Sequence, residues 1–289
     1  MLTVNQYCRN MFGEKLYKLS LNGGFSCPNR DGTLDSRGCI FCSAGGSGDF
    51  APSAAMDVDT QIEEAKARVA AKYHGSRYIA YFQAFTNTYA PVERLRTLYM
   101  PVIKRHDIAA LSIATRPDCL GDDVLELLGE LNSIKPVWVE LGLQTTKPES
   151  VHYIRRGYET KLYDMAVKKL QCLGIHVITH VILGLPGESR EDMLSTVRHV
   201  AAVGSDGIKL QLLHVLDGTD LAMDYRAGKF RAMELDEYID LLKECIALLP
   251  ENMVVHRLTG DGPKKSLIAP LWTGDKKRVL NAIRRELNI

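Results

Sequence analysis

Short apolar runs alternate with longer stretches of helical periodicity along most of the chain. The runs of strand length lie at 16–21, 78–82, 108–114, 137–143, 176–183 and 207–213. Between them, apolar residues recur at helical spacing over 57–73, 91–105, 122–131, 162–173 and 190–203. Strands separated by helices of this length predict a parallel sheet with right-handed crossover connections.

Six such strand–helix units, ending near Gly228, favour an open barrel over a closed eightfold one. We therefore expect an α/β fold, a partial (β/α)6 TIM-like barrel whose functional loops follow the carboxyl ends of its strands. From residue 233 the pattern changes to a helix at 235–249, a strand at 253–258 and a last helix at 275–287. This change predicts a core domain at 1–232 and a C-terminal α/β extension at 233–289 that packs on the barrel.

Charge and hydropathy narrow the class of protein only slightly. The 289 residues are 46% apolar, and 36 basic against 35 acidic residues give a net charge of +1. This balance does not indicate nucleic acid, although a local basic patch can still bind phosphate. Because no apolar run reaches about 18 residues and the N-terminus lacks a secretory pattern, we expect a cytoplasmic protein that does not enter a membrane.

Three of the seven cysteines lie in one loop after the first predicted strand. Cys39 and Cys42 form a C-x-x-C pair, and Cys27 lies twelve positions upstream. In a reducing compartment, clustered cysteines indicate a metal or catalysis more often than disulfides. A cubane iron–sulfur cluster normally takes four thiolates, so three cysteines leave one iron open. S-adenosylmethionine (SAM) chemistry requires such an open iron, because the methionyl amino and carboxylate groups of SAM can chelate it. One electron from the cluster then splits the C5′–S bond of the sulfonium and releases a 5′-deoxyadenosyl radical.

Two other interpretations of the cysteines stay open at this point. The first is a structural zinc with a distant fourth ligand, which would make the chain a zinc-stabilised RNA-binding module without catalysis. The second is three ordinary loop cysteines. The remaining cysteines are each expected to act as a small buried hydrophobic residue, and they form no second cluster motif: Cys8, Cys119, Cys172 and Cys245.

The segment CPNRDGTLDSRGCIFC resembles the cluster loop of Elp3-like radical SAM proteins. More narrowly, LSLNGGFSCPNRDGT, VELGLQT, HVILGLPGE and HRLTGDGP resemble the YtqA/YhcC-like radical SAM family, and the resemblance covers nearly the whole chain. It implies a radical SAM barrel with one [4Fe–4S] cluster on Cys27, Cys39 and Cys42, and SAM as the second cofactor. It also implies a tRNA partner, whose wobble carboxymethylaminomethyluridine is converted to aminomethyluridine, and an electron donor such as a reductase, a flavodoxin or a ferredoxin. A small metabolite as the radical's target is the alternative.

Candidate SAM contacts follow the second and fourth predicted strands. The segment after residue 82 stands where radical SAM enzymes carry a Gly-Gly-Glu-like segment, so Thr86 and Asn87 are expected to replace those contacts; a polar helix cap is the alternative. Glu140 would be a costly charge among apolar neighbours unless it had a partner. The resemblance assigns Glu140 and Gln144 to SAM, with a structural salt bridge as the alternative.

Two more SAM contacts are expected further along. Arg156 is a candidate clamp for the SAM carboxylate, because a guanidinium binds a carboxylate through two bonds; a solvated arginine is the alternative. Leu183 lies in a segment that resembles the one stacking on adenine.

Polar residues near the ends of other strands are the candidate substrate contacts, with a structural network as the alternative interpretation: Gln83, Gln211, His214, Arg257 and Asp261. The stretch from Lys264 to Arg285 is locally basic, which favours either phosphate binding or a solvated helix face.

Overall fold

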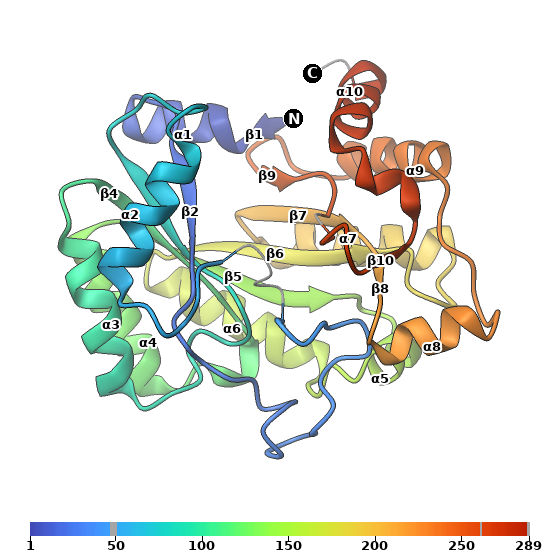
Figure 1. Ribbon diagram of the computed structural model, residues 1–289, viewed down its shortest axis with the longest axis horizontal. Helices are drawn as coiled ribbons and strands as arrows, with labels where there is room; N and C mark the ends of the chain where they lie inside the picture. The colour runs from blue at the N-terminus through green and yellow to red at the C-terminus, as the bar shows by residue number, and fades with distance from the viewer. Residues whose placement is uncertain (47–50, 261, 288–289) are drawn as a thin grey trace.

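The computed structural model describes residues 1–46, 51–260 and 262–287, and its centre is a curled parallel sheet (Figure 1). All six predicted strands are present within a residue or two of their expected limits: β2 (Tyr17–Leu21), β3 (Tyr78–Phe82), β4 (Ile108–Thr115), β5 (Val137–Gln144), β6 (His176–Leu183) and β7 (Gly207–Leu212). They pair in sequence order, each parallel to the next. The partial barrel is therefore confirmed.

Within the part of the chain that the structure describes, the sheet has eight strands, two more than the six predicted for the barrel. Strand β9 (Val254–Arg257) pairs parallel with β7, and β1 (Leu2–Thr3) pairs parallel with β9. Residues on either side of the predicted boundary at 232 thus share one sheet. A two-residue strand such as β1 carries no readable period, which is why sequence reasoning missed it.

The five predicted crossover helices are α2 (Val58–Val69), α3 (Val92–Lys104), α4 (Asp122–Ile134), α6 (Thr160–Cys172) and α7 (Arg190–Val203). The C-terminal part adds α9 (Leu235–Ala247), β10 (Leu267–Ala269) and α10 (Lys276–Leu287), with β10 pairing antiparallel to β8 (Val215–Leu216). Three α-helices among the described residues were not predicted: α1 (Val4–Phe12), α5 (Pro148–Tyr153) and α8 (Asp220–Arg226). No helix in the described ranges is long and apolar enough to cross a bilayer.

Local sequence sets the limits of α7, the helix after β6, the fifth barrel strand. Ser189 accepts a hydrogen bond from the backbone N–H of Asp192, whose side chain bonds back to the Ser189 N–H in a capping box. The helix ends at Gly204, which adopts a left-handed conformation (φ 83°) that is costly for other residues. Helix α7 therefore begins directly after the loop that follows the carboxyl end of β6.

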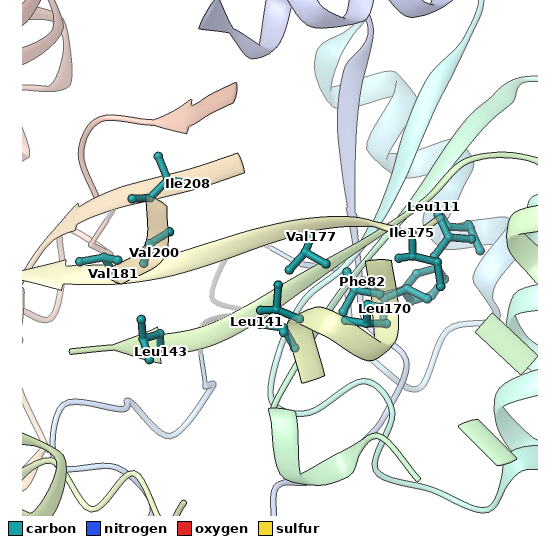
Figure 2. Close-up of a cluster of buried hydrophobic side chains, with 14 of the residues drawn as sticks. Phe82, Leu111, Leu141, Leu143, Leu170, Ile175, Val177, Val181, Val200 and Ile208 are labelled. Atoms are coloured by element: carbon teal, nitrogen blue, oxygen red, sulfur yellow. The ribbon is translucent and has the colours of Figure 1, made fainter. Parts of the chain in front are cut away.

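Alternate residues of the strands face the helices and form the main core. Leu141, Val177 and Ile208 are 0% exposed, and Figure 2 shows them with Leu170 of α6 and Val200 of α7. Burying each such side chain contributes about 1.5–3 kcal/mol. Because strand side chains alternate, the residues between these positions face the concave side of the sheet, where the polar groups gather.

Candidate active site

The three loop cysteines lie in two connected turns after β2. In the first turn, Arg30 N–H donates to the Cys27 carbonyl (2.8 Å), and in the second, Cys42 N–H donates to the Cys39 carbonyl (2.9 Å). Gly38 N–H donates to the Asn29 carbonyl and links the two turns. Gly38 has φ 78°, and a Cβ there would lie 2.8 Å from Arg30 Nε, so glycine is required on both counts.

Side chains from elsewhere in the chain hold this loop in place. Asn29 is 1% exposed and donates to the Arg155 carbonyl (2.7 Å) and to Cys39 Sγ (3.4 Å). Arg30 donates to the carbonyls of Cys42 and Ser43. Backbone bonds of Ile40 to Ile154 and Leu221 seat the loop beside α5 and α8, where Figure 1 shows it in blue.

The thiols lie close enough to influence one another. Burial, and then the neighbouring Cys42 and Cys27 thiols, raise the pKa of Cys39 to about 11, while Asn29 and Arg116 oppose the rise. Arg116, at the end of β4, is 8% exposed and is held by a two-point ion pair with Asp118. A buried guanidinium beside thiols favours their thiolate form, which is the form that binds iron.

The donor set fits an iron–sulfur cluster better than a single ion. Within the described parts of the chain, no three His, Cys, Asp or Glu side chains converge to hold one metal ion. A cubane binds each thiolate on a different iron, so its ligands surround the cluster and do not meet at one point. The N–H of Asn29 directed at Cys39 Sγ is the kind of bond that tunes such a cluster. The zinc interpretation finds no site in these residues.

The segment after β3 has an unusual backbone. Ala84 (φ 77°) and Phe85 (φ 59°) both adopt the left-handed conformation that normally favours glycine. Thr86 and Asn87 are buried; the Thr86 N–H donates to the Ser26 carbonyl, and the Asn87 side chain donates to the carbonyls of Ala84 and Ala114. Asn87 Oδ1 has no partner in the described residues. Strained backbone of this kind concentrates at ligand sites.

Gln144 is the last residue of β5 and Arg156 follows α5, and the two differ in their contacts. Gln144 has φ 63° at an irregularity of the β5–β6 pairing and is partly exposed. Arg156 is 1% exposed and directs all five of its N–H donors inward, to three backbone carbonyls and the Thr160 hydroxyl. Arg156 therefore holds together the segment between β5 and α6. Its bond to the SAM carboxylate stays a prediction, and all five N–H donors of Arg156 already have partners within the protein.

Glu140 lies at the centre of a polar network on the concave face. Its Oε1 accepts from Lys18 Nζ and Ser112 Oγ, both at 2.7 Å. Its Oε2 pairs with His180 Nε2 (2.6 Å) and accepts from Lys209 Nζ. The carboxylate is 0% exposed and both oxygens are fully bonded, so the contacts match the salt-bridge alternative. The predicted SAM contact of Glu140 is untested by this geometry and stays a prediction.

The network shifts the pKa of each of its members. Burial alone would raise the pKa of Glu140, but Lys18, Lys209 and His180 hold it well below its usual range. Burial lowers the pKa of Lys209 to about 7, with Glu140 opposing. Burial and Lys209 lower the pKa of His180 to about 4. Near neutral pH, Glu140 is ionised and His180 is neutral.

Leu183 ends β6 on the side that faces the helices. It is 0% exposed and packs in the main core, so its side chain does not face the concave side. Ile182, its neighbour on the strand, is partly buried against a separate apolar cluster. A contact of the Leu183 side chain with adenine therefore stays a prediction that the packing does not support.

The predicted substrate residues come from strands across the barrel. Gln83 follows β3 and is 8% exposed, and Gln211 lies on β7 and is partly exposed. His214 follows β7 and packs against Gly260, where any Cβ would overlap its ring. Arg257 ends β9 in register with Lys209. Asp261 lies outside the described residues.

Sequence reasoning missed the residues that support the predicted ones. Asn29 and Arg30 lie within the motif CPNRDGTLDSRGCIFC, but no sequence pattern marks a residue whose role is to hold the loop in place. Arg116 could have been found from its place directly after an apolar strand. Lys18 and Lys209 alternate with apolar residues on β2 and β7, which was the available signal for a polar concave face.

Two family models match this chain. The model of the radical SAM superfamily matches residues 36–200, and the model of a radical SAM C-terminal domain matches residues 205–288. The chain thus belongs to the radical SAM superfamily, whose cofactors are a [4Fe–4S] cluster and SAM.

Its relatives place it more narrowly. It is 47% identical to the protein YtqA of Bacillus subtilis, over 99% of this chain and 88% of that protein, which confirms the family recognised in the motifs. It is 25% identical to a tRNA uridine(34) acetyltransferase of Methanocaldococcus jannaschii, over 56% of this chain and 30% of that protein. The solved structure of Elp3 from Methanocaldococcus infernus has the same fold, with a TM-score of 0.69 at 17% identity, covering 94% of this chain and 63% of that one.

Proposed function

We propose that this protein is a tRNA-modifying radical SAM enzyme that converts wobble carboxymethylaminomethyluridine to aminomethyluridine. The observation that carries the tRNA part is the similarity of its barrel to a protein named as a tRNA uridine(34) acetyltransferase. A flipped base can enter the mouth of an open barrel, as in other enzymes that act on bases. A tRNA substrate also places the activity in the cytoplasm, with a reductase, flavodoxin or ferredoxin as the source of electrons.

The proposed cluster ligands are Cys27, Cys39 and Cys42, with Asn29 and Arg116 as supports for their thiolates. Once bound there, the [4Fe–4S] cluster and SAM would supply a 5′-deoxyadenosyl radical. The left-handed backbone at Ala84 and Phe85 leads into Thr86 and Asn87, which we propose, with the partly exposed Gln144, as the residues nearest SAM. Gln83, Gln211, His214 and Arg257 are the proposed substrate contacts.

The substrate has one methylene suited to radical attack. The carbon between the amine nitrogen and the carboxylate gives a radical that both neighbours stabilise. Loss of that hydrogen atom and one further electron yields an iminium, which water splits into the aminomethyl group and a two-carbon aldehyde acid. The two electrons balance the reduction of SAM to methionine and 5′-deoxyadenosine.

Nucleoside analysis tests this proposal. The anaerobically reconstituted protein is incubated with SAM, a reductant and tRNA that carries the carboxymethylaminomethyl group, and the tRNA is then digested. We expect carboxymethylaminomethyluridine to fall and aminomethyluridine to rise in equal amount, and Cys39→Ala to abolish the change. If every tRNA nucleoside keeps its mass while SAM is cleaved in the presence of a small metabolite, the tRNA assignment is wrong.

A further inference from the structure

The end of β5, which carries Gln144, is held by side chains from outside its own strand. Between Gly142 and Gln144 the pairing of β5 with β6 shifts its register, and Gln144 adopts a left-handed conformation (φ 63°). Tyr158 Oη donates to the Gly142 carbonyl (2.6 Å), and Arg156 Nη1 donates to the Leu143 carbonyl (2.8 Å). Left-handed backbone at a residue other than glycine is strained and persists only where its surroundings fix it. These two hydrogen bonds therefore hold the strained end of the strand in place.

Tyr158 is itself fixed by two guanidinium groups. Its ring centroid lies 4.9 Å from Arg116 Cζ and 4.6 Å from Arg156 Cζ. Its backbone carbonyl accepts from Arg156 Nε (3.0 Å), and the residue is buried. A guanidinium is attracted to the face of an aromatic ring, and the attraction is stronger where water is excluded. The stack therefore holds the Tyr158 hydroxyl at the Gly142 carbonyl, 3.5 Å from Gln144 Oε1.

The same stack packs against the loop that carries the cysteines. Gly157, the residue before Tyr158, is the point of contact: a Cβ there would lie 2.9 Å from Asn29 Oδ1 and 3.2 Å from Arg116 Nη2. Gly157 also has φ 83°, so glycine is required on both counts. Asn29 in turn donates to Cys39 Sγ (3.4 Å). One continuous set of contacts therefore supports both the cysteine loop and the end of β5.

We propose that Tyr158 is a positioning residue for SAM, because it sets the place of Gln144 relative to the cysteine loop. The inference rests on the proposed function, in which that loop carries the cluster and Gln144 lies beside SAM. A ligand that contacts two segments needs them at a fixed separation, and supporting contacts such as these provide it. Tyr158 does not contact SAM itself; it acts through the Gly142 carbonyl and the Gln144 side chain.

A double-mutant cycle on SAM affinity tests this role. The Kd of SAM is measured by equilibrium dialysis on the anaerobically reconstituted protein, without RNA. Tyr158→Phe keeps the ring and removes the hydroxyl, so we expect its Kd to rise about threefold to tenfold, the effect of one hydrogen bond. Gln144→Ala should raise the Kd at least as much, and the double variant should bind SAM no more weakly than Gln144→Ala alone. Additive effects, or the parent's Kd in either single variant, would overturn the proposal.

Gly142→Ala displaces the same amide by a second route. A Cβ at Gly142 would lie 2.5 Å from Gln144 Nε2 and 3.3 Å from Tyr158 Oη, so the flexible Gln144 side chain must move. Its SAM Kd should also rise, and an unchanged Kd would overturn the proposal. The matched control is Tyr163→Phe, which removes another buried hydroxyl, bonded to Thr179, and should keep the parent's Kd.

An equal rise in the Tyr163→Phe control would show that loss of any buried hydroxyl has this effect, and would overturn the role given to Tyr158. Iron content and the unfolding midpoint report whether each variant folds. If Tyr158→Phe does not fold, Gly142→Ala decides the matter.

Product analysis separates this inference from the proposed function. A raised SAM Kd in Tyr158→Phe, together with no aminomethyluridine from the parent, would support the positioning role and reject the reaction on tRNA. Aminomethyluridine from the parent, together with the parent's SAM Kd in Tyr158→Phe, would support the reaction and reject the positioning role.

Discussion

Arg156 and Glu140 show how burial decides what a charged side chain does. Both follow or lie in β5, and sequence reasoning placed both beside SAM. The five donors of Arg156 bond to residues between Leu143 at the end of β5 and Thr160 at the start of α6. The two oxygens of Glu140 bond to residues of strands β2, β4, β6 and β7. A buried charge needs such partners. Those of Arg156 lie within 13 residues of it, whereas those of Glu140 come from strands far away in sequence.

The cysteines give the first prediction at the residue scale. Replacing Cys27, Cys39 or Cys42 by Ala should remove the brown colour and most of the roughly four irons per chain, because each change removes a thiolate ligand. Cys172→Ala, an exposed position on α6, is the matched control and should keep the parent's iron content. Iron analysis after anaerobic reconstitution checks this, and a colourless parent with bound zinc would contradict it.

Glu140→Ala should destabilise the fold. The change leaves Lys18 and Lys209 without their common anion, and breaking a buried pair in this way costs about 3–5 kcal/mol in the free energy of unfolding. Urea unfolding measures the loss, and Glu126→Ala on the exposed face of α4 should stay within about 0.5 kcal/mol of the parent. Unchanged stability with lost SAM binding would show instead that Glu140 is a SAM ligand.

At the scale of elements, Asp107 joins α2, α3 and β4. Its carboxylate is bonded to Lys66 on α2 and to Arg105 just after α3. Burial alone would raise the pKa of Asp107, but the bonds from Arg105 and Lys66 hold it well below its ordinary value of 3.8. A carboxyl group with a depressed folded-state pKa stabilises the protein above its ordinary pKa, and that stability is lost as the pH falls further.

The parent protein should therefore lose stability as the pH falls below about 4, and Asp107→Asn should flatten that loss while being less stable at neutral pH. Urea midpoints measured across this range check the prediction. Asp236→Asn, at an exposed position of α9, should follow the parent's pH dependence. An Asp107→Asn protein with the parent's full acid sensitivity would contradict the role given to this carboxylate.

Helix α10 carries exposed cations over two buried residues. Lys276, Lys277 and Arg278 are exposed, while Val279 and Ile283 pack inward, and Figure 1 shows α10 far from the blue cysteine loop. Any tRNA contact at α10 would involve phosphates distant from the base in the barrel.

Replacing these three cations by Ala should weaken tRNA binding. The slope of log K against log salt should shrink by about 0.9 for each phosphate that the variant no longer neutralises. The matched control is the triple Ala variant of the exposed Lys161, Lys168 and Lys169 on α6. Titrations at several salt concentrations check both. If the α10 variant keeps the parent's slope, the stretch is only a solvated helix face.

For the whole molecule, the sequence predicted the six barrel strands and five crossover helices, because each had a long and clear period. It did not predict β1 or the place of β9 in the sheet, since a parallel partner is chosen by packing between distant segments and not by local pattern. The cysteine loop was readable because its spacing is local. The roles of Asn29, Arg116 and Lys209 were not, because they depend on neighbours that only the fold brings together, even where the position of the residue carried a signal.

The central step of the proposed reaction is hydrogen transfer from the modified wobble uridine to a 5′-deoxyadenosyl radical. Deuterium transfer tests it most directly, with tRNA deuterated at the methylene between the amine and the carboxylate. We expect 5′-deoxyadenosine to gain one deuterium and aminomethyluridine to appear in matching amount. Unlabelled 5′-deoxyadenosine together with an unchanged wobble uridine would contradict this step.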